Sequence, residues 1–256
     1  MIRFRDFSAA IASGRKHGRH VFVQCLPKMG STALSCSLPD AVHEFGMDAA
    51  PLLIQQHRQP DFDDLRWQWL QQRRQQLAPT VDICTSLFLL TAELSDQALD
   101  RHGHQRFLLN RSLRPWLRSI SNWSYQNASN PLRHAWDSSY RLFVHQSDPE
   151  LQAVMPQSLN SLRSMVRFWM PVWLVYQRWI AIHMDIGIAH SPSILMTDDN
   201  GVIPTNANRS HFSKGFEQSF NRLIPAMPSL GISPERNRAF QQDLRSKLLA
   251  MPASAP

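Results

Sequence analysis

A short segment near the N-terminus combines residue types that bind anions. Residues 27–32 read Pro-Lys-Met-Gly-Ser-Thr and follow the β-branched and aromatic run His20–Leu26. The residues after them, Ser31–Leu38, are compatible with a helix, so the pattern predicts a strand, a tight turn and a helix. Free backbone N–H groups and the positive end of the helix dipole meet at such a turn. The turn can therefore hold a phosphate or a sulfate.

Each residue of the turn has a role in this prediction. Gly30 lets the backbone approach the anion, Ser31 and Thr32 add hydroxyl donors, and Lys28 adds a positive charge. Met29 completes the predicted binding segment. Because the lysine precedes the glycine, the segment is not the Gly-x-x-x-x-Gly-Lys-Ser/Thr loop of nucleoside triphosphatases.

An arginine and a serine follow a second predicted strand in the middle of the chain. Arg106–Asn110 is a compact apolar run, and Ser112–Tyr125 has apolar residues at helical spacing. Arg111 stands directly after the strand, and Ser119 comes two helical turns later. An arginine at a strand end can bind phosphate through two hydrogen bonds, and the serine lies on nearly the same helix face.

These two segments resemble the nucleotide-binding segments of the sulfotransferases that use 3′-phosphoadenosine 5′-phosphosulfate. The loop of that family usually reads Pro-Lys/Arg-x-Gly-Thr-Thr after the first strand, and five of its six positions are similar here. The resemblance implies that residues 27–32 hold the 5′ side of this co-substrate and that Lys28 stabilises charge on the bridging oxygen. It also implies that Arg111 and Ser119 hold the 3′-phosphate.

The resemblance extends in order to the end of the chain. Ile194–Asp199 is similar to a late strand of the family, and Phe212–Gly215 is similar to a late Arg-Lys-Gly phosphate contact, which makes Lys214 a candidate ligand. Lys214 is also compatible with a solvent-facing helix residue. Trp123 is open to two readings, as an aromatic wall for adenine or as a core residue.

Sulfuryl transfer also requires a base that takes the proton of the acceptor. The candidates downstream of the turn are His43, Glu44 and His57. The resemblance favours Glu44, because some family members place a glutamate about one helix length after the loop, and His43 comes next. The segment near Cys84 lacks the histidine that cytosolic members often carry, so a non-catalytic nucleotide-binding protein stays open as an alternative.

Alternating strands and helices predict the fold class. We expect one sulfotransferase-like domain over residues 1–256, a three-layer P-loop-like α/β fold whose central parallel sheet is flanked by helices, with ligands at the carboxyl ends of the strands. A helix over 86–99 is an alternative to the end of the second strand. Segments 40–63 and 127–155 are expected to be loops that help select the acceptor, which the sequence does not identify. Strands are predicted at 20–26, 81–90, 106–110 and 193–197, and the main helices at 31–38, 63–77, 112–125, 130–144, 157–186, 214–224 and 234–251.

Composition limits the partners. Apolar residues make up 43% and charged residues 18% of the chain, which is ordinary for a folded protein. The formal charge of +7 favours an anionic partner. Since the chain has no lysine-rich tail, zinc finger or ribonucleoprotein motif, a nucleotide is preferred, and a basic nucleic-acid-binding protein is kept as an alternative. The oligomeric state is left open.

The cysteines and histidines indicate neither disulfides nor a metal. The three cysteines are odd in number and have no Cys-x-x-Cys spacing, which favours a reducing, cytoplasmic location. The pairs His17/His20 and His102/His104 are expected in polar loops without supporting carboxylates, so no metal is expected.

Neither a membrane span nor an export signal is expected. The most apolar stretch, 165–184, is interrupted by Arg167 and Arg178 and therefore reads as a buried helix, not as a span of about 20 apolar residues. The basic N-terminus is not followed by the apolar stretch of a signal peptide.

Overall fold

The structure is a computed structural model that describes residues 4–77, 80–183, 194–197, 213–224 and 234–251. The described chain packs as two compact units, one formed by the segment up to Asn110 together with β5 (Ile194–Met196), the other by the helices that follow Arg111. Each unit is described by itself. That the chain forms one sulfotransferase-like domain stays a prediction.

The first unit is built on a five-stranded parallel sheet in the order β2-β3-β1-β4-β5. β1 (His20–Gln24) lies in the centre, with β3 (Val81–Cys84) on one side and β4 (His104–Asn110) on the other. β2 (Ala41–His43) pairs with β3, and β5 pairs with the end of β4. Because all strands are parallel, their carboxyl ends meet at one edge of the sheet. The predicted α/β class with a central parallel sheet is confirmed.

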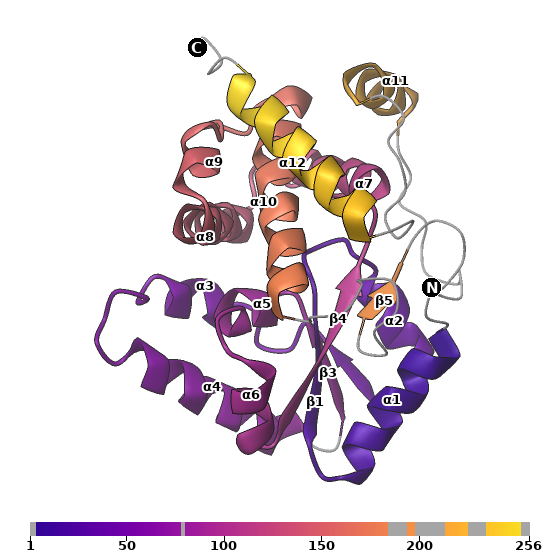
Figure 1. Ribbon diagram of the computed structural model, residues 1–256, viewed down its shortest axis with the longest axis vertical. Helices are drawn as coiled ribbons and strands as arrows, with labels where there is room; N and C mark the ends of the chain where they lie inside the picture. Colours follow the sequence, from indigo (N-terminus) through magenta and orange to yellow (C-terminus); the bar gives the residue numbers. More distant parts are fainter. Residues whose placement is uncertain (1–3, 78–79, 184–193, 198–212, 225–233, 252–256) are drawn as a thin grey trace. The chain divides into compact units, whose positions relative to one another are not determined.

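Helices cover both faces of this sheet, which gives the unit three layers (Figure 1). On one face, Phe7 of α1 packs edge-on against Phe107 of β4, with ring centroids 5.5 Å apart. On the other face, Phe22 of β1 packs with Leu70 and Leu87 in a buried cluster. The helices of the unit are α1 (Phe4–Lys16), α2 (Ser31–Ser37), α3 (Ala49–Ile54), α4 (Phe62–Leu77), α5 (Ser86–Thr91) and α6 (Asp96–Arg101).

The second unit is helical and packs around tryptophans of its longest helix. Trp169 meets the buried Trp116 edge-on, with centroids 6.1 Å apart, and donates to Ser124 Oγ at 3.0 Å. Asp148 accepts hydrogen bonds from Arg178 and Arg245. None of the helices in the described part of the chain is long and apolar enough to cross a membrane. The helices are α7 (Leu113–Gln126), α8 (Pro131–Ser147), α9 (Pro149–Ala153), α10 (Leu162–His183), α11 (Lys214–Leu223) and α12 (Pro234–Ala250).

Several predicted elements need correction. The strand expected at 81–90 ends at Cys84, and α5 and α6 follow, so the helical alternative describes its second half. Neither predicted acceptor segment is a single loop, because 40–63 contains β2 and α3 and 127–155 contains α8 and α9. The sequence pattern also missed α1. Residues 184–186, 193, 198–199 and 212, which belong to predicted segments, lie outside the described residues.

The placement of two histidines also needs correction. His20 and His104 are not in polar loops: they are the first residues of β1 and β4, they face each other in the sheet register, and both are 1% exposed. The β-branched run after His20 favours a strand. Because His20 is the first residue of that strand, its side chain is buried in the core.

Candidate functional site

The turn after β1 has the predicted form, strand then turn then helix. Lys28 has a φ of 65° and Gly30, the residue that caps α2, has a φ of 100°, so both adopt left-handed backbone conformations. That conformation costs a lysine free energy but costs glycine little. Met29 is buried, and its carbonyl accepts a hydrogen bond from Thr197 Oγ1 next to β5. Thr32 is exposed at the start of α2.

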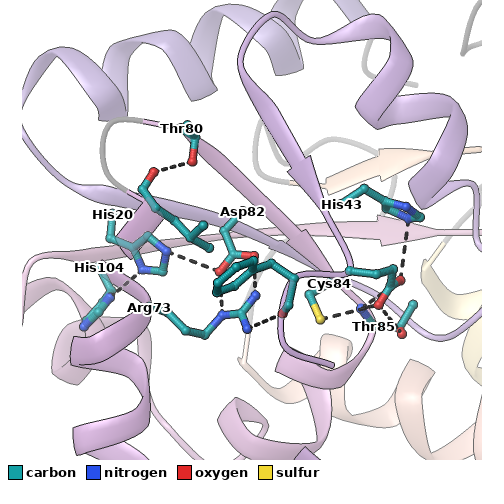
Figure 2. Close-up of polar contacts among 11 residues, drawn as sticks. His20, His43, Arg73, Thr80, Asp82, Cys84, Thr85 and His104 are labelled. Atoms are coloured by element: carbon teal, nitrogen blue, oxygen red, sulfur yellow. Dashed lines mark hydrogen bonds and ion pairs between the residues drawn. The ribbon is translucent and has the colours of Figure 1, made fainter. Parts of the chain in front are cut away.

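Glu44 lies directly after β2 and is fixed at both its backbone and its carboxylate. Its φ is 56°, and its amide donates to the Ile83 carbonyl at 2.8 Å. Its carboxylate accepts hydrogen bonds from the Thr85 amide at 3.3 Å, from Thr85 Oγ1 at 3.1 Å and from Cys84 Sγ at 3.4 Å (Figure 2). The end of β3 therefore holds this side chain in one orientation.

His43 joins the turn to Glu44. Its Nε2 shares a hydrogen bond with Ser31 Oγ at 3.0 Å and lies 3.6 Å from Glu44 Oε1. The imidazole is about a quarter exposed, at 28%, and the Glu44 side chain is 19% exposed. The structure thus brings His43, Glu44 and Ser31 together where β1, β2 and β3 end.

The charges at this edge influence one another. Burial lowers the pKa of Lys28, and the carboxylate of Glu44 partly offsets that effect. Burial also lowers the pKa of His43; Glu44 opposes this shift and Lys28 adds to it. His43 is consequently neutral at pH 7. The same burial raises the pKa of the Cys25 thiol well above its ordinary value, so that this thiol stays protonated.

The edge therefore offers an ammonium group, a neutral imidazole, a hydroxyl and an oriented carboxylate within one small region. A half-buried ammonium attracts an anion more strongly than a solvated one, and a neutral imidazole can accept a proton. This set suits transfer of an anionic group to a protonated acceptor. The third candidate base, His57, shares a hydrogen bond between its Nδ1 and the Ile54 carbonyl at the end of α3.

The remaining predicted ligands belong to the second unit. Arg111 is half-buried just before α7, and its carbonyl accepts a hydrogen bond from Trp173 Nε1 at 3.1 Å. Ser119 lies in α7 and is only 9% exposed. Lys214 is exposed at the first position of α11, and Trp123 is half-buried in α7. A shared phosphate site for Arg111, Ser119 and Lys214 stays a prediction.

Sequence reasoning did not select Thr85 and Cys84, which hold Glu44. A signal was present, because a polar residue that follows a buried strand of a parallel sheet lies at the ligand-binding edge. The pairing of β2 with β3, which brings Glu44 to that edge, required the structure. Within the described ranges, no group of three or more His, Cys, Asp or Glu side chains could hold a metal ion.

No protein-family model, no curated protein and no solved structure matches the chain. Function must therefore be argued from the site itself.

Proposed function

We propose that the protein transfers a sulfuryl group from 3′-phosphoadenosine 5′-phosphosulfate to a hydroxyl or amine acceptor. The observation that carries the proposal is the convergence of Lys28, Ser31, His43 and Glu44 at the carboxyl ends of β1 to β3. Lys28 and Ser31 come from the segment that resembles the sulfotransferase loop. His43 and Glu44 come from a different segment and were selected as candidate bases for the same reaction.

In this proposal the S–O bond to the bridging phosphate oxygen breaks while a bond forms between sulfur and the acceptor atom. Lys28 stabilises the negative charge that develops on the bridging oxygen, and the Gly30–Thr32 amides hold the 5′ phosphate. The acceptor proton passes to the base at the edge of the sheet. Arg111 and Ser119 hold the 3′-phosphate.

The contacts support His43 ahead of Glu44 as the proton acceptor. The Glu44 carboxylate already accepts hydrogen bonds from Thr85 and Cys84, which hold its oxygens in place. The imidazole of His43 is neutral and partly exposed. Glu44 then stabilises the imidazolium that forms when His43 takes the proton.

The three cysteines in the described chain are free thiols, which agrees with the proposed reducing, cytoplasmic location. We propose no metal for this reaction, since the charge on the leaving nucleotide is met by Lys28. The acceptor is to be found by screening.

The experiment is a transfer assay with the labelled co-substrate and a panel of phenols, alcohols and amines. Wild type transfers the label, and Lys28→Ala lowers the rate by about 10²–10³-fold, the range for removing one group that stabilises transition-state charge. The matched control is Lys16→Ala, at the exposed end of α1. Full activity in Lys28→Ala would refute the role of the lysine, and nucleotide binding without transfer would indicate the non-catalytic alternative.

A further inference from the structure

A buried arginine connects the interior of the first unit to the turn that follows β2, residues 44–46. Arg73 comes from α4 and is 2% exposed. Its Nη1 donates to the Phe45 carbonyl at 2.6 Å, one residue after Glu44. No sequence motif marked this residue.

The orientation of Arg73 is fixed by its other contacts. Nε and Nη2 donate to the two carboxylate oxygens of Asp82 at 2.8 and 2.6 Å, and the Asp82 side chain is fully buried. The guanidinium also lies over the ring of Trp69, 4.7 Å from its centroid, and over the ring of Phe45, 5.7 Å from its centroid. These contacts orient the donor that reaches the Phe45 carbonyl; Figure 2 shows the hydrogen bonds between Arg73 and Asp82.

The turn that receives this hydrogen bond is strained and needs such support. Glu44 and Gly46 on either side of Phe45 both have a φ of 56°. A left-handed glutamate persists only where surrounding contacts fix it. Thr85 and Cys84 hold the carboxylate of Glu44, whereas Arg73 holds the backbone that follows it.

We propose that Arg73 is a positioning residue for the turn at residues 44–46. It keeps the His43–Glu44 pair directed at the edge of the sheet where Lys28 and Ser31 lie. The role rests on the proposed function. It acts through the Phe45 carbonyl, and Asp82 serves to orient the guanidinium. A lysine at position 73 could not make the three planar, fork-shaped hydrogen bonds that fix both Asp82 and the turn.

The test compares Arg73→Lys with Arg66→Lys. Arg66 is a matched control because it also lies in α4, is 5% exposed and pairs with two carboxylates, Asp63 and Glu93, that do not belong to the turn. Hydrogen exchange is measured at the Glu44 and Thr85 amides and expressed relative to the amides of β1, which report opening of the whole sheet. This ratio separates loosening of the turn from general destabilisation.

We expect exchange at the Glu44 and Thr85 amides, relative to β1, to rise by about tenfold or more in Arg73→Lys and to stay unchanged in Arg66→Lys. In the transfer assay, kcat falls by about 10²-fold in Arg73→Lys, while KM for the nucleotide changes by less than about twofold. An unchanged exchange ratio would overturn the proposal. So would equal losses in the two variants.

The buried charge of Asp82 could prevent Arg73→Lys from folding. The double variant Arg73→Gln with Asp82→Asn removes both charges and is expected to show the same local rise in exchange. The exchange measurement also separates the two proposals. If wild type transfers no sulfuryl group, the proposed function fails, whereas the exchange ratio still shows whether Arg73 holds the turn.

Discussion

The two ends of one sheet use polar residues in opposite ways. At the amino ends, His20, His104 and Asp82 are essentially excluded from solvent; the His20 and His104 Nδ1 atoms lie 2.9 Å apart, and His20 Nε2 lies 3.3 Å from Asp82 Oδ2. At the carboxyl ends, His43 and Glu44 are partly exposed. The first group is paired and inaccessible, which suits stability, and the second is accessible, which suits chemistry.

Charge separates the two ends further. Positive φ values do not, because they occur at Lys28 and Glu44 at the carboxyl ends and also at Asp40, directly before β2. At the amino ends, burial would raise the pKa of Asp82, but the contacts with His20 and Arg73 outweigh it and keep that pKa below its ordinary value. We expect mutations at the amino ends to lower mainly stability and mutations at the carboxyl ends to lower mainly activity. Arg73 contributes to both, because it donates to Asp82 and to the Phe45 carbonyl.

The largest expected effect is a loss of stability when Asp82, in the group at the amino ends, loses its partner Arg73. Arg73→Ala leaves the fully buried Asp82 carboxylate without its two guanidinium hydrogen bonds, and it should lower the free energy of unfolding by about 3–5 kcal/mol in urea denaturation. Arg66→Ala is the control, because its partners Asp63 and Glu93 are 75% and 66% exposed and are readily solvated. Equal losses in the two variants would contradict the difference between buried and exposed pairs.

The next effect concerns activity at the carboxyl ends. His43→Gln should lower kcat by about 10²-fold, the lower range for loss of a general base, with little change in unfolding. Because burial lowers the pKa of His43, the wild-type rate should rise with pH only below the ordinary histidine range and be level at neutral pH. The variant should lack this acid limb. If the rate of His43→Gln still falls at acidic pH, another group is responsible for the pH dependence.

A third effect tests burial at the amino ends through pH. Burial, followed by the charges of His20 and Arg74, lowers the pKa of His104 to about 3, so His104 stays neutral in the folded protein while the unfolded chain takes up a proton below about pH 6.5. Stability attributable to His104 is therefore present at neutral pH and lost as the pH falls. Between pH 7 and 5 wild type should lose about 2 kcal/mol more than His104→Gln.

The control for that measurement is His17→Gln, at an exposed position after α1. It should keep the full wild-type loss between pH 7 and 5. Equal acid sensitivity of His104→Gln and wild type in urea titrations would show that His104 is not neutral in the folded state.

The smallest effect separates strain from binding. Gly30→Ala and Gly18→Ala each place a side chain at a positive φ, of 100° and 68°, and each should cost about 1 kcal/mol in unfolding. Only Gly30 lies in the proposed binding turn. Nucleotide affinity should therefore fall in Gly30→Ala and be retained in Gly18→Ala, as measured by calorimetry. Loss in both variants would point to a general destabilisation.

Local patterns were enough to predict much of the fold. The β-branched run at 20–26 and the apolar spacing of α7 and α10 predicted those elements, because such patterns act over a few residues. Short elements were lost: β2 has three residues and α3 six, too few to establish a period. The second strand was extended past Cys84, because the apolar residues of 87–90 suit a buried helix as well as a strand.

Part of the candidate site followed from the sequence, and part required register. The sequence selected His43, Glu44 and Lys28 one by one. Their convergence with Ser31 depends on the pairing of β2 with β3, on the side of β3 that faces away from β1. The Arg73–Asp82 pair links a helix to a strand, and the His20–His104 contact joins residues 84 positions apart. No periodicity encodes such contacts.

The most direct test of the account is calorimetric binding of 3′-phosphoadenosine 5′-phosphate, the expected product nucleotide, to wild type, Lys28→Ala and Arg111→Ala. We expect wild type to bind the nucleotide and binding to weaken by about tenfold or more in both variants, since each loses a charge-assisted contact to phosphate. Lys16→Ala should bind as wild type does. Absence of binding to folded wild type would contradict the proposed nucleotide site and leave the convergence of Lys28 and His43 without this ligand.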